Sequence, residues 1–357
     1  MINLKDYGYT EADAPKEGLI PGRVTEHMRD RYTVITQYGE VSAVLLGAFV
    51  HNVGLKEELP HVGDFVLLKH NETGVSQISE VLPRRTKFSR ANTLGSSSGH
   101  IKHAYEQVVA ANFDYVFIIS SLNQDFNISR IIRYHTQTLA SGGIPVVILT
   151  KADLDENHAG KVGEVEKVLP GVPVLALSSH TGYGLSSLSE FLKPGKTVVF
   201  LGMSGVGKSS LLNTLMNQDV MEVKSIREDD SRGRHTTTHR ELFMLPGGAM
   251  VIDTPGMREL GLYDAEESIR SVYKSIDELT RECRFSDCGH EREPGCAIKR
   301  ALRDGSLSKK YWEKYQAGLK ETNYIEKKTE YMRIRNKEHK SLSKFGKELK
   351  KSGKIRY

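Results

Sequence analysis

Cysteine is scarce in this chain: among 357 residues there are three, and all of them lie between Cys283 and Cys296. An odd and tightly clustered set does not suit a disulfide framework and indicates a metal site in a reducing compartment. No apolar run is long enough to cross a membrane, and the first 30 residues lack an apolar core behind a basic start. We therefore expect no transmembrane helix and no secretory signal, but a globular protein of two or three domains in a reducing compartment.

Basic charge is concentrated at one end of the chain. The net charge is +5 overall, but residues 309–357 hold 16 Lys and Arg against 6 Asp and Glu, a net of +10, so the remainder carries −5. A basic helical tail on a near-neutral body favours an anionic partner, nucleic acid above all, although a solvated charged helix has the same composition. Tyr311, Tyr315 and Leu319 share a helical face of this tail, with Trp312 beside it, which indicates packing.

The N-terminal part of the chain has the pattern of a small barrel. Short strands are predicted between turn-forming residues at 19–27, 32–36, 41–46, 65–69 and 75–82. Five strands in this length favour an OB-fold over residues 1–83. OB-folds often bind oligonucleotides, although a barrel that only packs on its neighbour has the same pattern. Residues 84–108, with a Gly/Ser run at 95–99, are predicted to be a linker.

Residues 109–275 alternate between apolar strands and amphipathic helices. The predicted strands are 113–121, 144–149, 172–177, 197–201 and 250–252, and the predicted helices are 128–139, 162–169, 185–192 and 210–216. This alternation indicates an α/β domain with a parallel sheet covered on both faces. Ligands of such sheets bind beyond the carboxyl ends of the strands, so the residues that follow each strand are the candidates for a functional site.

A complete phosphate-binding motif follows the strand at 197–201. The sequence matches G-x-x-x-x-G-K-[ST] and leads directly into a predicted helix. Its backbone N–H groups can surround phosphate oxygens, its lysine can reach the β- and γ-phosphates, and its serine hydroxyl can ligate Mg²⁺. The nucleotide-binding residues predicted here are Gly202, Met203, Ser204, Gly205, Val206, Gly207, Lys208, Ser209 and Ser210.

The strands at 144–149 and 172–177 end in residues that suit a guanine base. Thr150, Lys151, Ala152 and Asp153 form a T-K-x-D element, in which the carboxylate can accept hydrogen bonds from guanine N1–H and N2. The commoner first residue of this element in GTPases is Asn. Ser178 and Ser179 follow the next strand, where their backbone can support guanine O6.

The strand at 250–252 is followed by a D-T-P-G element. Asp253 can hold Mg²⁺ through water, and the Gly256 N–H can meet the γ-phosphate. In the polar stretch before this strand, Thr237 is the residue expected to complete the Mg²⁺ shell, although a surface turn is the alternative for that stretch. Ordinary GTPases begin with the phosphate loop and end with the guanine elements. The order here is one circular permutation of theirs, which the close chain termini of a domain tolerate.

Four residues near the C-terminal side of this domain suit zinc. Cys283, Cys288, His290 and Cys296 supply three thiolates and one imidazole, a tetrahedral set without an open position. We expect one structural zinc ion in a domain of residues 276–308. Buried cysteines beside an unrelated histidine are the alternative.

Together these elements resemble the circularly permuted ribosome-assembly GTPases called RsgA. The resemblance covers most of the chain and rests on the barrel, T-K-A-D at 150–153, G-M-S-G-V-G-K-S at 202–209, G-R-H-T-T-T at 233–238, D-T-P-G at 253–256 and the C-x4-C-x-H-x5-C cluster. It implies a cytoplasmic bacterial GTPase with OB-fold, GTPase and zinc domains. It further implies late maturation of the small ribosomal subunit, with rRNA contacts, Mg²⁺ with GTP, subunit-stimulated hydrolysis and release. We expect a monomer. Thr150 and the long basic tail depart from the pattern.

The group that positions the attacking water is left open. Met257 stands where many GTPases have a glutamine and cannot orient water, so intrinsic turnover should be low. His235 is the internal candidate, although a histidine that contacts RNA or solvent is an equal alternative, and the ribosome is another source. The predicted catalytic set consists of His235 together with Lys208, Thr237 and Asp253.

Two other functional classes fit parts of the sequence. A P-loop ATPase or small-molecule kinase would not need Asp153, so Asp153→Asn would leave its nucleotide preference unchanged. A passive RNA-binding module would keep its function after Lys208→Ala.

Overall fold

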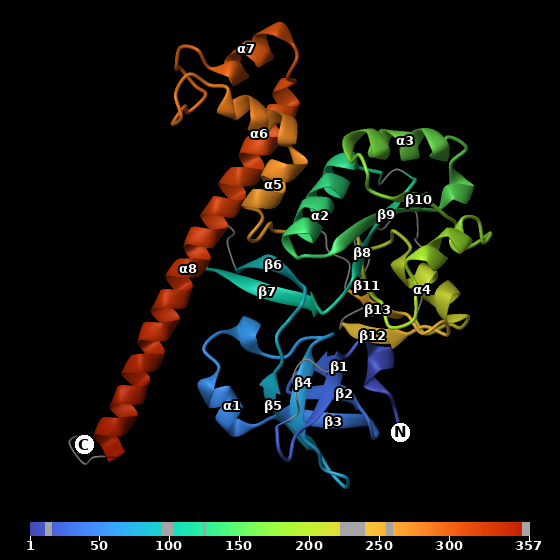
Figure 1. Ribbon diagram of the computed structural model, residues 1–357, viewed down its shortest axis with the longest axis vertical. Coiled ribbons are helices and arrows are strands. Elements are labelled where there is room, and N and C mark those ends of the chain that lie inside the picture. Colours follow the sequence, from blue (N-terminus) through green and yellow to red (C-terminus); the bar gives the residue numbers. More distant parts are fainter. Residues whose placement is uncertain (11–15, 95–102, 124–125, 222–239, 255–259, 352–357) are drawn as a thin grey trace.

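The computed structural model describes residues 1–10, 16–94, 103–123, 126–221, 240–254 and 260–351 (Figure 1). Within them, one sheet of eleven strands has the order β10-β9-β8-β11-β13-β12-β1-β2-β3-β5-β4, and β6 and β7 form a separate pair. The strands are β1 Ile20–Met28, β2 Arg31–Thr36, β3 Gly39–Leu45, β4 Phe65–Lys69, β5 Ser76–Val81, β6 Lys87–Leu94, β7 His103–Ala111, β8 Tyr115–Ser121, β9 Ile144–Thr150, β10 Val174–Ala176, β11 Thr197–Leu201, β12 Glu241–Met244 and β13 Met250–Asp253.

The first five strands close into the predicted OB-type barrel. They pair in the order β1-β2-β3-β5-β4, β3 and β5 are parallel, and β4 returns to pair with β1. The helix α1, Gly47–Asn52, lies in the connection between β3 and β4. Alternate residues of the strands fill the barrel interior, among them the fully buried Val24, Val66 and Ile78. The strand pattern of the sequence therefore predicted this domain correctly.

The second half of the sheet is the predicted α/β domain. Strands β10, β9, β8, β11 and β13 are parallel, and each side of the sheet has its own apolar layer. Ile118 of β8 faces α2, Ile128–Ala140, and α3, His158–Val168. Its neighbour Phe117 faces α4, Lys208–Met216. Because successive side chains of a strand point to opposite faces, this alternation explains the nearly continuous apolar runs in the sequence.

Barrel and α/β domain are joined by shared structure. Strand β12 lies between β13 and β1 in the sheet and pairs antiparallel with β1, with Glu26 opposite Glu241. Beside this junction the fully buried Arg23 donates hydrogen bonds to the Asn112 carbonyl at 2.7 Å and to Thr197 Oγ1 at 3.0 Å. Burial lowers the pKa of Arg23 to about 9. Because buried polar groups are costly to leave without partners, these bonds hold the two domains in one arrangement.

The stretch predicted as a linker contains β6 and most of β7, which pair antiparallel. The polar composition that suggested a linker comes from pairs across the two strands. Ser89 donates a hydrogen bond to Glu106 at 2.6 Å and Arg90 donates one to Gln107 at 2.9 Å, while Phe88 and Val108 are fully buried. The Gly/Ser run at 95–99 lies outside the described residues.

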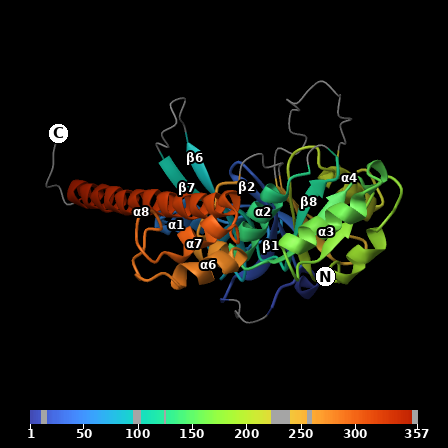
Figure 2. The ribbon, with the colours of Figure 1, turned by 90° about the horizontal axis from the view of Figure 1, so that it is seen from above.

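Four helices form the C-terminal part: α5 Glu266–Val272, α6 Lys274–Arg281, α7 Ala297–Asp304 and α8 Lys309–Lys351. At about 1.5 Å per residue, the 43 residues of α8 span about 65 Å. The helix passes α5, α6 and the β6–β7 pair and extends beyond them (Figures 1 and 2). Trp312 and Tyr315 are buried at its start, which confirms that the aromatic stripe serves packing. Among the described helices, none has the length and apolar content needed to cross a membrane.

Candidate nucleotide and zinc sites

The phosphate loop connects β11 to α4. Gly205 and Gly207 have φ angles of 82° and 97°, which favour glycine, and a Cβ at Gly202 would lie 2.5 Å from the Ile119 carbonyl oxygen. Lys208, the first residue of α4, is 7% exposed, and its ammonium donates hydrogen bonds to the Gly202 and Met203 carbonyls at 2.9 and 2.8 Å. These carbonyls hold the lysine charge within the loop that would surround phosphate.

Burial lowers the pKa of Lys208 to about 8, and only the nearby Asp253 carboxylate acts in the opposite direction. Asp253 ends β13 and is 1% exposed, and the next residue, Thr254, donates a hydrogen bond to the Phe200 carbonyl of β11 at 2.6 Å. The structure thus brings two predicted catalytic residues, Lys208 and Asp253, to one end of neighbouring parallel strands. His235, Thr237, Gly256 and Met257 lie outside the described residues.

The donor set at this sheet edge fits magnesium. The Ser209 hydroxyl and the Asp253 carboxylate are hard oxygen donors, which Mg²⁺ prefers, and Mg²⁺ sites normally include substrate phosphates as well. Together with a nucleotide, Ser209 would hold the ion directly and Asp253 would hold it through water, and the ion would neutralise phosphate charge.

The guanine element contacts the phosphate loop directly. The Thr150 hydroxyl donates a hydrogen bond to the Val206 carbonyl at 2.5 Å, and the Lys151 ammonium donates one to the Gly205 carbonyl at 3.0 Å. Thr150 is 3% exposed, and its hydroxyl lies closer to this loop than to the Ser120 carbonyl at 3.4 Å, whereas Asp153 is exposed at the rim in η3, Ala152–Leu154.

The serine element lies beside the guanine element. The Ala152 N–H donates a hydrogen bond to the Leu177 carbonyl at 3.1 Å. The buried Ser178 hydroxyl accepts hydrogen bonds from the His180 and Thr181 N–H groups, both at 3.2 Å. Three segments that follow different strands, at 150–153, 178–179 and 202–209, are thus assembled at one edge of the sheet.

Sequence reasoning missed one residue near this site, Asn213. Its side-chain amide donates a hydrogen bond to the Met221 carbonyl, and its amide oxygen accepts one from the Met221 N–H, both at 2.8 Å. Asn213 lies one helical turn after Ser209 and so on the same face of α4, and this spacing was the sequence feature that could have identified it. It fixes Met221, the last residue that the structure describes before residue 240.

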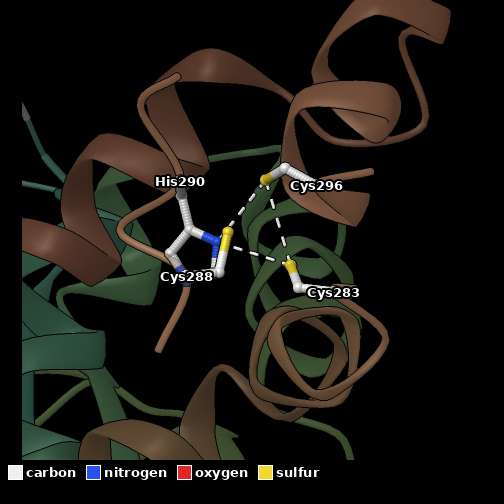
Figure 3. Close-up of side chains that lie close together, drawn as sticks. All are labelled: Cys283, Cys288, His290 and Cys296. Atoms are coloured by element: carbon white, nitrogen blue, oxygen red, sulfur yellow. Dashed lines mark hydrogen bonds between the residues drawn. The ribbon is translucent and has the colours of Figure 1, made fainter. Parts of the chain in front are cut away.

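The four predicted zinc ligands converge at the C-terminal part (Figure 3). Their ligand atoms all lie within 4.8 Å of one another. The Sγ atoms of Cys283 and Cys296 are 3.9 Å apart, and His290 Nδ1 lies 3.5 Å from each. A zinc ion with bonds of about 2.3 Å to sulfur needs ligand separations of about 3.8 Å in a tetrahedron. The donor set and spacing therefore fit zinc.

Helix ends and a tight loop position these ligands. Cys296 is the N-cap of α7, and its sulfur accepts a hydrogen bond from the Lys299 N–H at 3.4 Å. Burial disfavours ionisation of Cys283, but hydrogen bonds from the N–H groups of Ala297 and Ile298 and from the side chains of Cys296 and Cys288 together outweigh it and lower the pKa of the thiol.

The loop that carries His290 is organised around Glu293. The Glu293 carboxylate accepts hydrogen bonds from the N–H groups of Gly289, Glu291 and Arg292 at 2.9–3.0 Å. Backbone N–H groups, its own among them, lower its pKa to about 2. His290 has a φ of 61°, and its ring meets the Trp312 ring edge-on at 5.4 Å, so α8 packs against the zinc loop.

Comparisons with known proteins agree with this geometry. The family model described as RsgA GTPase matches residues 81–263. A protein of Listeria innocua named small ribosomal subunit biogenesis GTPase RsgA 1 is 44% identical over 328 residues, which cover 91% of each chain. The protein of the same family name from Opitutus terrae is 39% identical and covers 88% of this chain and 86% of its own.

Two solved structures have a similar fold. YjeQ from Thermotoga maritima is 28% identical, covers 85% of this chain and 98% of its own, and has a TM-score of 0.59. YloQ, described as a circularly permuted GTPase, is 22% identical, covers 87% of this chain and 97% of its own, and has a TM-score of 0.57, which supports the fold alone.

Proposed function

This chain belongs to the RsgA GTPase family, and we propose that it is a late-stage maturation factor of the small ribosomal subunit. It binds the subunit and its rRNA in the GTP-bound state and is released after subunit-stimulated hydrolysis. The observation that carries the proposal is the contact between the guanine element and the phosphate loop, through Thr150 and Lys151. A protein whose partner binding depends on GTP needs at least a guanine-binding element next to a phosphate loop.

The site residues divide the work of binding GTP. Residues 202–210 surround the phosphates, and Lys208, which now donates to carbonyls of its own loop, would donate to phosphate oxygens instead. Asp153 reads the guanine N1–H and N2, while Ser178 and Ser179 support O6. In GTP-bound protein, Ser209 and Thr237 would hold Mg²⁺, with Asp253 acting through water, and Gly256 would meet the γ-phosphate.

Water activation is the step for which the chain has least machinery. Met257 cannot orient the attacking water, so turnover by the free protein should be slow. His235 is the internal group proposed to position the water, and the ribosomal subunit supplies or places the rest. Because the protein and the ribosomal subunit share the task of positioning the water, hydrolysis depends on binding to the subunit, and release can follow it.

The remaining parts serve contact with the subunit. Four protein ligands leave zinc no open position, so its role is structural. The barrel, the zinc domain and the basic end of α8 would together contact rRNA. The protein would act in the cytoplasm as a monomer, and the orientation of its zinc domain would differ between the GTP and GDP states.

The proposal is tested by GTP turnover with and without purified small subunits, with Lys208→Ala as the inactive control. We expect slow turnover alone, clear stimulation by subunits, and tighter subunit binding with a non-hydrolysable GTP analogue than with GDP. Equal subunit affinity in both nucleotide states, together with unstimulated turnover, would refute the proposed function. Asp153→Asn should remove the preference for GTP over ATP, and an unchanged preference would favour an ATPase or kinase.

A further inference from the structure

The segment at 260–263 follows the D-T-P-G element closely and is held from three sides. Leu260 comes six residues after Thr254, so at most about 22 Å of extended chain separates these two described residues. Leu260 and Leu262 are 3% and 4% exposed. Thr254 and this segment therefore anchor the two ends of the chain that leaves the D-T-P-G element.

Helix α2 supplies the first set of contacts. Arg133 Nε donates a hydrogen bond to the Leu260 carbonyl at 2.6 Å. One helical turn later, Gln137 donates to the Tyr263 carbonyl at 3.0 Å and accepts from the Tyr263 N–H at 2.9 Å. Because residues four apart share a helix face, α2 grips both ends of the segment.

Strand β6 contacts the middle of the segment. The Ala91 N–H donates a hydrogen bond to the Gly261 carbonyl at 3.2 Å. A Cβ at Gly261 would lie 2.8 Å from the Ala91 Cβ, so the approach of the two backbones requires glycine.

The C-terminal helix α8 supplies the third set. Glu321 accepts a hydrogen bond from the Leu262 N–H at 3.2 Å. Its carboxylate also pairs with Arg133 through both guanidinium Nη atoms, one of them at 2.9 Å. One turn further, Ile325 is 2% exposed and packs with Ala91 and Tyr263. A single carboxylate thus joins α8 to α2 and to the segment that leaves the D-T-P-G element.

We propose that this Arg133–Glu321 latch transmits docking of α8 on its partner to the D-T-P-G element, and that Glu321 is a positioning residue for stimulated hydrolysis. The inference rests on the proposed function. The residues beyond Tyr331 contain ten Lys and Arg against two Glu, a net charge of +8, so an anionic partner would bind that end of the helix. A displacement of the helix there would reach Glu321, because both lie on one continuous α8.

Space beside the latch allows such a displacement. A cavity of about 800 Å³ lies between α2 and α8 and is lined by Arg130, Arg133, Lys314 and Glu321 among others. On this side, α8 is held to α2 by polar contacts, such as that from Lys314 Nζ to Ser129 Oγ at 2.5 Å. Polar contacts across a cavity can exchange partners, whereas a close-packed apolar interface resists sliding.

The first experiment compares Glu321→Gln with a matched control on the same helix, Glu313→Gln. Glu313 is 60% exposed, and within the described part of the chain its ion pair is with Lys309, at 3.9 Å. In Glu321→Gln we expect basal turnover and GTP affinity to be retained, while stimulation by small subunits falls at least about fivefold, the lower range of allosteric coupling. Glu313→Gln should be stimulated like the wild type. Equal stimulation of Glu321→Gln and wild type would overturn the latch.

A second measurement does not depend on the ribosome. The Leu262 N–H donates a hydrogen bond to Glu321. The hydrogen-exchange rate of this amide in the full-length protein should differ between the complex with a non-hydrolysable GTP analogue and the complex with GDP. The difference should shrink in Glu321→Gln and in Arg133→Lys, which keeps the charge but loses the two-point pairing. If the wild type shows this difference but subunits do not stimulate it, the proposed function fails, while the coupling of the latch to the nucleotide site stands on the exchange data. If exchange at Leu262 ignores the nucleotide, the latch fails.

Discussion

Removal of zinc should unfold the segment around residues 276–305 and leave the GTPase domain folded. The short helix α7 has eight residues, and helices of that length are not stable alone in water. Its connection to α6 passes through a loop whose ligands, Cys288 and His290, converge with Cys283 and Cys296. Without the metal, three thiols and an imidazole remain close together with nothing to bind.

The magnitudes favour the metal as the main stabilising contribution. Ile298 and Leu307 are 0% and 6% exposed, and full burial of such a side chain contributes about 1.5–3 kcal/mol. Structural zinc contributes about 10–16 kcal/mol in small zinc-binding peptides near neutral pH. Each remaining apolar contact contributes less than the metal, so we expect chelation to unfold the segment.

Trp312 is the reporter, because it is the only tryptophan of the chain, is 7% exposed and meets the His290 ring at 5.4 Å. Chelation should shift its emission to longer wavelength in proportion to the zinc released, while binding of a fluorescent GTP analogue stays unchanged. Cys296→Ser, which lacks one ligand, should show the shifted emission before any chelator is added. Unchanged Trp312 emission and intact amide protection of α7 in metal-free protein would refute the reasoning.

Three further changes test the nucleotide site and the tail. Thr150→Val removes the hydroxyl that donates a hydrogen bond to the Val206 carbonyl, at a cost of about 1–3 kcal/mol, so GTP affinity should fall about tenfold. Thr150→Ser keeps a hydroxyl and should retain the affinity. Equal GTP affinity of the wild type and both variants would contradict the role of this bond. Burial lowers the pKa of Lys208 to about 8, and bound phosphate favours its charged form, so GTP affinity should fall as pH rises from 7 to 8.5. Lys208→Arg stays charged and should show a flatter dependence of GTP affinity on pH. Parallel pH profiles of the two proteins would contradict a role of Lys208 in binding phosphate. Deletion of the chain beyond Tyr331 should weaken the salt dependence of subunit binding and leave basal hydrolysis unchanged. An unchanged salt dependence would indicate that this end of the helix is only a solvated charged helix. The cut must not be made before α8, because Trp312 and Tyr315 are buried.

Local patterns predicted most of the fold. The five barrel strands were found within about two residues of their bounds, because alternating side chains and turn residues mark each of them. The hairpin of β6 and β7 was missed, because its polar residues find partners across the strand pair rather than nearby in the sequence. The predicted helix at 185–192 is a 3-10 segment, Leu185–Glu190, since its three serines leave few residues that favour an α-helix.

The same distinction holds for the functional residues. The phosphate loop and the zinc ligands each lie within a short stretch, so their spacing was enough to find them. The meeting of Thr150 with Val206 was predictable only through the rule that parallel strand ends share an edge. No rule of this kind pairs Arg133 with Glu321, which lie 188 residues apart, because their contact depends on where α8 packs.

The GTPase domain is attached to its two neighbours by different kinds of contact, and this difference sets the direction in which a nucleotide signal can travel. On the barrel side, β12 pairs with β1 and the buried Arg23 bonds to both domains, so movement there would break sheet pairing and leave buried polar groups without partners. On the C-terminal side, Arg133 and Glu321 are 36% and 29% exposed, so water can replace their bonds at lower cost. Circular permutation puts the D-T-P-G element at the end of the domain, next to these weaker contacts. A rearrangement around the γ-phosphate would therefore move the zinc domain and α8 rather than the barrel, and by linkage a partner that favours the moved position must tighten GTP binding by the same factor.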